Sequence, residues 1–165
     1  LPETEADLEV ELALVIGVGG RRIPESSALE HVFGYTILND VSARDVQVGR
    51  EQLTLGKGVD TFAPLGPEVV TRDELGDASQ FRLSSSLNGV TMQDASTSDM
   101  LFGPARLVSF VSELVTLAPG DVISTGTPAG CGLFRTPPVY LRPGDVVTAS
   151  IEGIGELRNP VEAGW

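Results

Sequence analysis

The first part of the chain alternates charged and apolar residues and then becomes continuously apolar. Asp7, Glu9 and Glu11 alternate with leucines and a valine, and the run Leu-Ala-Leu-Val-Ile follows. Successive side chains of a β-strand point to opposite faces, so the three carboxylates would share one face. The continuous apolar run is typical of a buried strand. The pattern therefore predicts a strand over Leu8–Val18, ended by the pair of glycines that follows.

The rest of the pattern predicts more strands than helices. Apolar residues at i, i+3 and i+4 spacing predict one long helix, Ala105–Leu117, opened by Pro104. A shorter helix is expected over Glu25–Phe33, ended by Gly34. The other expected elements are Tyr35–Leu38 (strand), Ser42–Gln47 (tight helical turn), Val48–Leu55 (polar, mobile loop), Glu68–Thr71 (strand), Phe81–Leu87 and Thr91–Asp94 (hairpin), Val146–Ile151 and Gly155–Asn159 (strands). Together they indicate a β-dominated α+β fold.

Length and composition fit one globular domain over residues 1–165, with 41% hydrophobic residues. The net charge of −12 argues against nucleic acid or an anionic membrane as the main partner. No apolar segment is long enough to span a bilayer. The single cysteine, Cys131, allows no internal disulfide and indicates a reducing, cytoplasmic compartment. Because the chain begins at Leu1 rather than Met, we expect upstream residues to be missing.

The carboxylates near the start of the chain have two interpretations. Glu9 and Glu11 offer the hard oxygen ligands that Mg²⁺ prefers, although an isolated E-x-E pattern is more often a solvated edge face. Asp40 has Arg44 and Gln47 four and seven residues after it. If the turn is helical, these three offer a metal ligand, an anion clamp and an amide on one face, or else an ordinary cap with an i,i+4 salt bridge. Motifs elsewhere in the chain favour the metal interpretation.

These motifs follow one another along nearly the whole chain. They are Glu9–Ala13, Gly34–Thr36, Asn39–Gln47, Gly56–Pro67, Thr125–Gly130, Pro143–Val146 and Gly153–Leu157. Each is moderately specific, but in their order and spacing they resemble the catalytic domain of the fumarylacetoacetate hydrolase family. Members of that family hydrolyse, tautomerise or decarboxylate 2,4-dioxo acids and related enols. The resemblance implies a mixed β-sheet roll with few helices, and a single catalytic domain.

The resemblance also implies a divalent-metal site. Glu9, Glu11 and Asp40 would be the metal ligands, with Mg²⁺ expected and Mn²⁺ or Ca²⁺ as alternatives. Lys57 would lie close to the metal as a catalytic residue and stabilise the negative charge that develops on the substrate. These cations would make an acidic protein locally positive, as an anionic substrate requires.

Substrate contacts are implied as well. Arg44, a second candidate catalytic residue, and Gln47 would hold the carboxylate or keto oxygens of a small dioxo or enol acid, together with Lys57. Thr127 would cap the substrate carboxylate through its hydroxyl group and the backbone N–H groups of its loop.

The activity implied is metal-dependent chemistry on a 2,4-dioxo acid or its enol, as in aromatic catabolism. We rank hydrolysis of a C–C bond in an acylpyruvate or fumarylpyruvate first. Isomerisation of a 2-hydroxyhepta-2,4-diene-1,7-dioate is close to it, and oxaloacetate decarboxylation or tautomerisation is third. A non-catalytic sensor that binds a metal or small acid is the alternative from another class.

Two further expectations follow from the family. Its hydrolases carry a His and Glu pair in a lid upstream of the E-x-E strand, and we expect that lid to be missing from this chain. His31 lies outside any family motif, so we interpret it as an ordinary helix residue. Family members are usually homodimers, and a homodimer is expected here, through the apolar face of the first strand or of the Ala105–Leu117 helix.

Overall fold

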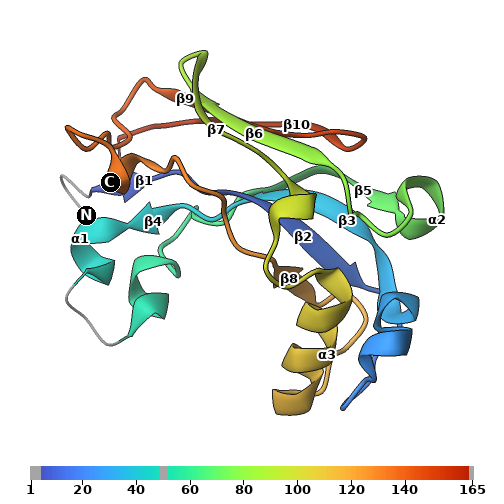
Figure 1. Ribbon diagram of the computed structural model, residues 1–165. Helices are drawn as coiled ribbons and strands as arrows, with labels where there is room; N and C mark the ends of the chain where they lie inside the picture. The colour runs from blue at the N-terminus through green and yellow to red at the C-terminus, as the bar shows by residue number, and fades with distance from the viewer. Residues whose placement is uncertain (1–4, 49–51, 164–165) are drawn as a thin grey trace.

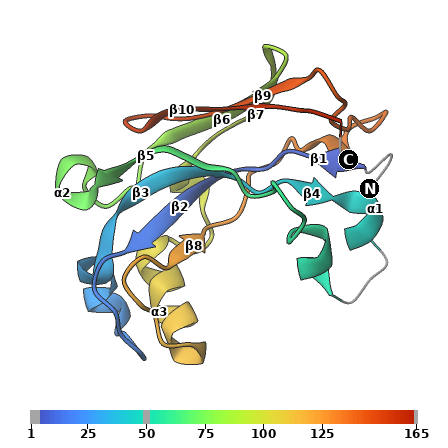
Figure 2. The same cartoon turned by 180° about the vertical axis from the view of Figure 1, so that it is seen from behind.

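Two four-stranded antiparallel sheets form the body of the computed structural model, which describes residues 5–48 and 52–163. One sheet has the strand order β5-β3-β2-β8 and the other β10-β9-β6-β7, and β1 and β4 form a short separate pair (Figures 1 and 2). The strands are β1 (Ala6–Asp7), β2 (Val10–Ile16), β3 (Val32–Asn39), β4 (Ser42–Ala43), β5 (Leu65–Thr71), β6 (Arg82–Leu87), β7 (Val90–Ser96), β8 (Val122–Ser124), β9 (Val146–Ile151) and β10 (Gly155–Pro160). The predicted β-dominated α+β fold is confirmed.

Helical segments are few and short. They are α1 (Arg44–Gln47), α2 (Arg72–Leu75), α3 (Pro104–Leu114) and the 3₁₀ turns η1 (Glu25–His31), η2 (Leu53–Gly56), η3 (Thr97–Asp99) and η4 (Gly132–Phe134). The predicted long helix is confirmed as α3, but it ends before Leu117, whose backbone N–H and C=O both pair with Gly20. Within the described ranges, no helix has the length and apolar character that crossing a membrane requires.

The predicted strand over Leu8–Val18 forms as the shorter β2. Asp7, which was expected to share a face with Glu9 and Glu11, instead belongs to β1 and pairs with β4. The ladder is interrupted because side chains take the backbone N–H groups in between. Leu8 donates to the Asp7 carboxylate at 2.8 Å, and Glu9 donates to the side-chain oxygen of Asn39 at 3.1 Å. This interruption allows Asp7 and Glu9 to serve different structural purposes.

The prediction of a helix over Glu25–Phe33 ended by Gly34 was wrong at its end, at Val32, Phe33 and Gly34. The chain forms the 3₁₀ turn η1 and then enters β3 at Val32, so that Gly34 lies inside a central strand. A Cβ atom on Gly34 would lie 2.3 Å from the carbonyl oxygen of Val70 on β5. Glycine is therefore needed here for close strand approach, and it does not end a helix.

The segment that leads to the candidate site is a chain of short turns. The predicted tight turn Ser42–Gln47 consists of β4 followed by α1. In the polar stretch Val48–Leu55, residues 48 and 52–55 are described, and residues 53–55 belong to η2. Residues 49–51 of the predicted mobile loop lie outside the described residues. The predicted hairpin and the last two strands form as β6–β7 and β9–β10.

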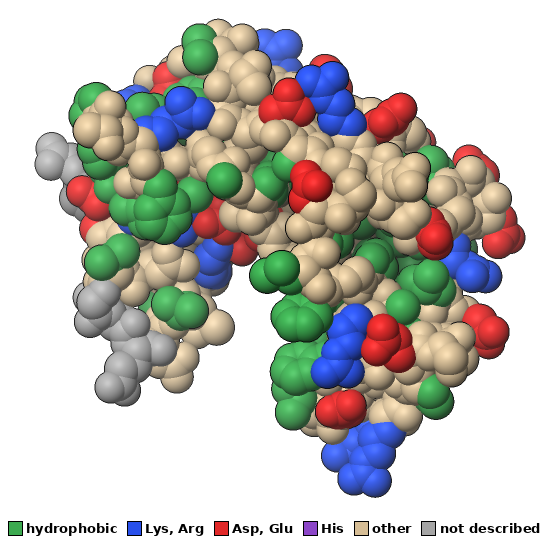
Figure 3. Space-filling view, viewed as in Figure 1, with side chains coloured by type: hydrophobic (Ala, Val, Ile, Leu, Met, Phe, Trp, Pro, Cys, Tyr) green, Lys and Arg blue, Asp and Glu red, His purple; other side chains and the backbone are tan. Residues whose placement is uncertain are grey.

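The main core lies between the two sheets, where β2 and β3 contact β6 and β9. Leu12, Leu14 and Ile37 are fully buried in it. Because side chains alternate along β2, Glu11 points to the opposite face of the sheet. Figure 3 shows a hollow between the part of the molecule that contains α1 and η2 and the part that contains α3, with charged side chains at its upper left edge.

Candidate metal centre

Three carboxylates from two neighbouring strands converge. Glu9 precedes β2, Glu11 lies on β2, and Asp40 directly follows β3. The antiparallel register pairs Val10 with Asn39, and the Asp40 N–H donates to the Glu9 carbonyl at 2.9 Å, which brings the two strand ends together. One carboxylate oxygen from each residue lies within 4.8 Å of the others. The structure thus brings together the residues proposed as metal ligands.

Lys57 reaches this cluster from the turn η2. Its ammonium nitrogen lies 2.8 Å from Oε2 of Glu9 and 2.5 Å from Oδ2 of Asp40. Burial of the side chain lowers the pKa of Lys57, but the hydrogen bonds to Asp40 and Glu9 outweigh burial and the pKa is raised overall. Lys57 is therefore a cation at neutral pH. Gly56 permits the approach, since a Cβ there would lie 2.8 Å from the Cβ of Gln47 on α1.

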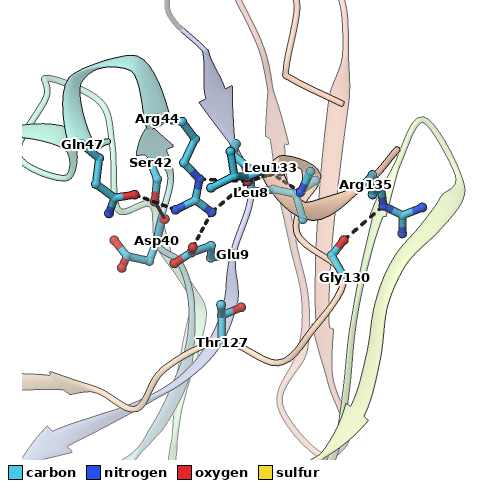
Figure 4. A network of polar contacts seen from close by, with 12 residues as sticks. Leu8, Glu9, Asp40, Ser42, Arg44, Gln47, Thr127, Gly130, Leu133 and Arg135 are labelled. Atoms are coloured by element: carbon cyan, nitrogen blue, oxygen red, sulfur yellow. Dashed lines mark hydrogen bonds and ion pairs between the residues drawn. The ribbon is translucent and has the colours of Figure 1, made fainter. Parts of the chain in front are cut away.

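Arg44 is buried beside the cluster, and its guanidinium contacts protein groups (Figure 4). Nε and Nη2 donate to Oδ2 of Asp7 at 3.0 and 2.8 Å, and Nη2 also donates to Oε1 of Glu9 at 2.5 Å. Nη1 donates to Oε1 of Gln47 at 2.9 Å. Burial acts to lower the pKa of Arg44, yet the bonds to Asp7 and Glu9 raise it overall. The geometry is that of a residue that orients Glu9, and its proposed contact with substrate would have to use the remaining N–H of Nη1.

Among the residues that the structure describes, the hydrogen-bond partners of Glu11 are neutral. Its Oε2 accepts from the hydroxyl group of Ser124 and from the N–H of Gly126 at 2.8 Å. Burial raises the pKa of Glu11; the bonds from Ser124 and Gly126 oppose this effect, and the charges of Asp40 and Glu9 add to it. A divalent cation at the cluster would favour the ionised form of this carboxylate.

The loop that contains Thr127 is anchored to β2. The Thr127 hydroxyl donates to the Val10 carbonyl at 2.9 Å and accepts from Nε2 of Gln93 at 2.8 Å. Gln93, on β7, is buried and also donates to the carbonyl of Pro128, while its own oxygen accepts from Val10 and Ser85. The hydroxyl is thus engaged within the protein, and the proposed substrate contact of Thr127 narrows to its backbone N–H.

The donor set fits a hard divalent cation. Among the described residues, the carboxylates of Asp7, Glu9, Glu11 and Asp40 are faced by two cations, Arg44 and Lys57. These leave an excess of negative charge that a divalent cation would balance. Oxygen ligands of this kind suit Mg²⁺, Mn²⁺ and Ca²⁺.

Two residues that support the cluster, Asp7 and Gln93, were not predicted from the sequence. Asp7 was expected on the same face as Glu9 and Glu11 but was given no partner, because a partner across β1 and β4 cannot be inferred from sequence spacing. Gln93 gave no signal at all, since a glutamine in a hairpin strand is commonplace. His31 lies at the end of η1, and its Nδ1 is 2.8 Å from the carbonyl oxygen of Val18.

Comparison with known proteins agrees with this geometry. The family profile described as "Fumarylacetoacetate (FAA) hydrolase C-terminal" matches residues 2–162. The chain belongs to the fumarylacetoacetate hydrolase family. A relative from Bos taurus, named "Oxaloacetate tautomerase FAHD2A, mitochondrial", is 49% identical over 163 residues, which are 97% of this chain and 52% of the relative. The chain thus spans about half the length of this family member.

Solved structures of the family have the same fold. A fumarylacetoacetate hydrolase from Exiguobacterium antarcticum superimposes with a TM-score of 0.94 at 48% identity, covering 99% of this chain and 58% of that one. A fumarylpyruvate hydrolase from Pseudomonas aeruginosa, solved in complex with Mn²⁺ and pyruvate, gives a TM-score of 0.87 at 32% identity, covering 96% and 66%. The described fold is therefore that of the family.

Proposed function

We propose that this chain is the catalytic domain of a divalent-metal-dependent enzyme that interconverts the keto and enol forms of oxaloacetate. The observation that carries the proposal is the cluster of Glu9, Glu11 and Asp40, with Lys57 bonded to two of them. The choice of reaction rests on the relatives that are named oxaloacetate tautomerases, among them the bovine protein at 49% identity and a Bacillus subtilis protein at 42%. The fumarylacetoacetate hydrolase from Exiguobacterium antarcticum is similar to the same extent, at 48%, so hydrolysis stays as the second candidate. This choice reverses the ranking drawn from the sequence, in which C–C hydrolysis came first and tautomerisation third.

Each residue of the cluster has a definite part in this reaction. Glu9, Glu11 and Asp40 would hold the ion, which when bound supplies a Lewis acid that polarises the 2-oxo group and favours the enol. Lys57, which is hydrogen-bonded to Glu9 and Asp40, would offset carboxylate charge and attract the anionic substrate. Tautomerisation moves one proton between carbon and oxygen of the substrate and needs no water as reactant.

The remaining residues would orient the substrate and the ligands. Arg44 holds Oε1 of Glu9, and its bond to Gln47 keeps the Gln47 amide beside the cluster. We propose the backbone N–H of Thr127 as a donor to the substrate carboxylate, in a loop whose Gly126 already holds Glu11. The ion would be Mg²⁺ or Mn²⁺, with Ca²⁺ as an alternative, and the substrate a small keto acid.

Hydrolysis of a fumarylpyruvate-type C–C bond is the second candidate. It is favoured by the likeness to the fumarylpyruvate hydrolase, whose complex contains Mn²⁺ and pyruvate. Hydrolysis requires an activated water molecule, and the one histidine of the chain, His31, bonds to Val18 rather than to the cluster. The His and Glu pair that hydrolases of the family are expected to carry would then have to come from another part of the protein.

The test uses the full protein that contains this chain, stripped of metal with a chelator and then supplied with Mg²⁺ or Mn²⁺. Decay of the ultraviolet absorbance of enol-oxaloacetate is followed against a blank that contains metal alone. We expect turnover that the metal restores, that Glu11→Gln abolishes, and that the exposed control Glu68→Gln on β5 retains. Cleavage of fumarylpyruvate without oxaloacetate turnover would replace the proposal with hydrolysis. Metal binding without turnover of either acid would favour the sensor.

A further inference from the structure

Asp7 is a buried carboxylate for which the proposed chemistry has no direct use. It is 1% exposed, and both of its oxygens accept several hydrogen bonds. Oδ1 accepts from the N–H of Leu8 at 2.8 Å and of Gly132 at 2.7 Å. Oδ2 accepts from Nε and Nη2 of Arg44 and from the N–H of Leu133 at 2.9 Å. We propose that Asp7 is a positioning residue that acts through Arg44 to set the Glu9 carboxylate for metal binding, an inference that rests on the proposed function.

The connection from Asp7 to Glu9 is direct. The guanidinium contacts Asp7 through Nε and Nη2, the two donors on one edge of its fork, and this contact fixes the plane of the group. Nη2 then has one hydrogen left, which is directed at Oε1 of Glu9 at 2.5 Å. The other oxygen of Glu9, Oε2, lies 2.8 Å from Lys57. The position of Arg44 thus determines which oxygen of Glu9 is engaged and how the carboxylate is turned.

The turn η4 is built around Asp7. A Cβ atom on Gly132 would lie 2.7 Å from Oδ1 of Asp7 and 1.8 Å from the carbonyl oxygen of Val139, so the backbone can approach only with glycine here. This approach delivers two consecutive N–H groups, from Gly132 and Leu133, to the carboxylate. Asp7 therefore remains a fixed anion against which Arg44 is held, rather than a group that can follow Arg44 as it moves.

The charge of Asp7 matters as much as its position. Asp7 and Glu9 share the single positive charge of Arg44. Without Asp7, the full charge of a buried guanidinium would fall on Glu9 and would compete with a metal ion for the same carboxylate. Mutating a residue that fixes a metal ligand through hydrogen bonds typically weakens metal binding by about 10- to 100-fold.

The experiment measures Mn²⁺ binding by calorimetry to the metal-stripped protein, so that it does not depend on any turnover. Asp7→Asn should raise the Kd for Mn²⁺ by about 10- to 100-fold. Ser112→Ala is the matched control, because Ser112 is equally buried and hydrogen-bonded but lies on α3 and contacts Ile23 and Ser109. It should lower the melting temperature without changing the Kd.

A double variant tests whether the effect passes through Arg44. If it does, the losses of Asp7→Asn and Arg44→Met are not additive, and the double variant binds Mn²⁺ no more weakly than the worse single variant. Additive losses, or a wild-type Kd for Asp7→Asn, would overturn the proposal. If Asp7→Asn does not fold, Arg44→Lys takes its place, since lysine neutralises Asp7 but cannot bridge it to Glu9. A wild-type Kd for Arg44→Lys would then refute the role.

Crystal structures of the metal-free wild type and Asp7→Asn separate this inference from the proposed function. We expect the Glu9 carboxylate to turn in the variant even if the protein proves not to bind Mn²⁺. An unmoved Glu9 side chain would refute the positioning role, whereas wild-type protein that binds no metal would refute the proposed function.

Discussion

The carboxylates of the cluster differ in whether a cationic side chain of the protein contacts them. Glu9 contacts Arg44 and Lys57, and Asp40 contacts Lys57. Within the described part of the chain, Glu11 accepts from two neutral groups, those of Ser124 and Gly126. A buried carboxylate without a cationic partner is costly, which is the physical reason for its raised pKa. Glu11 is therefore the ligand with most to gain from a bound cation.

This asymmetry predicts an unusual pH dependence of the metal-free protein. Because the pKa of Glu11 is raised above its ordinary value of 4.5, the folded state binds this proton more tightly than the unfolded chain. Its contribution to the free energy of unfolding is fully present below pH 4.5 and is lost as the pH rises through the folded-state pKa. Glu11→Gln should remove that loss, and Mn²⁺ should reverse it in the wild type.

Urea unfolding at a series of pH values, with a chelator present, checks this expectation. Glu68→Gln, which changes an exposed carboxylate on β5, should keep the profile of the wild type. If wild type and Glu11→Gln lose stability in parallel as the pH rises, the buried carboxylate does not carry the effect.

Thr36 offers a second prediction at the scale of one residue. Among the side chains that the structure describes, its Oγ1 is the one buried polar atom without a hydrogen-bond partner. Replacing the hydroxyl by a methyl group in Thr36→Val removes the cost of desolvating it, so we expect stabilisation by about 1 kcal/mol. Thr97→Val is the matched control, because the Thr97 hydroxyl accepts from the Phe81 N–H at 2.8 Å, and it should destabilise by about 1–2 kcal/mol. Equal shifts in the two melting temperatures would contradict the assignment.

The sequence was sufficient to predict that Glu9, Glu11 and Asp40 lie together as candidate metal ligands, but not to find the groups that hold them. Glu9, Glu11 and Asp40 lie in recognisable local motifs, and antiparallel pairing of the two strands places them together. Arg44 was expected to bind substrate, since in the sequence it is simply a cation four residues after Asp40. Its hydrogen bond to Asp7, 37 residues away, depends on the pairing of β1 with β4, and no local sequence pattern predicts that pairing.

At the scale of secondary structure, the largest difference from expectation is the segment that was expected to be a helix over Glu25–Phe33. The local sequence permits a helix there, but Val32 and Phe33 instead form the beginning of β3, which pairs with β2. Tertiary pairing thus overrides a weak local preference. Strands with a clear turn between them, such as β6 and β7 around Asn88, formed as expected because the turn itself fixes their register.

The close approach of β5 to β3 at Gly34 can be tested by mutation. The missing side chain of Gly34 lets the carbonyl of Val70 approach, so Gly34→Ala should separate the two strands and destabilise the fold by about 1–3 kcal/mol. Gly103→Ser is the control, because a Cβ there meets no atom within 4 Å and serine is favoured at this position, the N-cap of α3. The midpoints of denaturant unfolding compare the two variants. If Gly34→Ala is as stable as the control, then the pairing of β5 with β3 does not need the close approach that glycine permits.

At the scale of the whole molecule, apolar side chains gather on the α3 side of the hollow (Figure 3). Leu101 is 95% exposed and Phe102 61% exposed just before α3, and Phe110 and Leu114 are exposed on the helix itself. Leu101 and Phe102 also line a pocket of about 520 Å³ that is bounded by the loop from Thr125 to Ala129. Clusters of large exposed apolar residues commonly mark an interface. The expected homodimer therefore has a candidate surface, one of the two that the sequence suggested.

A charge placed on this surface should decide whether it is the dimer interface. Leu101→Asp would have to bury an unpaired carboxylate in the interface, so we expect at least a tenfold weaker dimer, measured by analytical ultracentrifugation of the full protein. Val90→Asp, at another exposed apolar position, on the β6–β7 hairpin, should leave the association constant unchanged. If Val90→Asp dissociates the dimer and Leu101→Asp does not, the interface lies instead on the sheet that contains β6 and β7. A monomeric wild type would instead leave this apolar surface free to bind another protein.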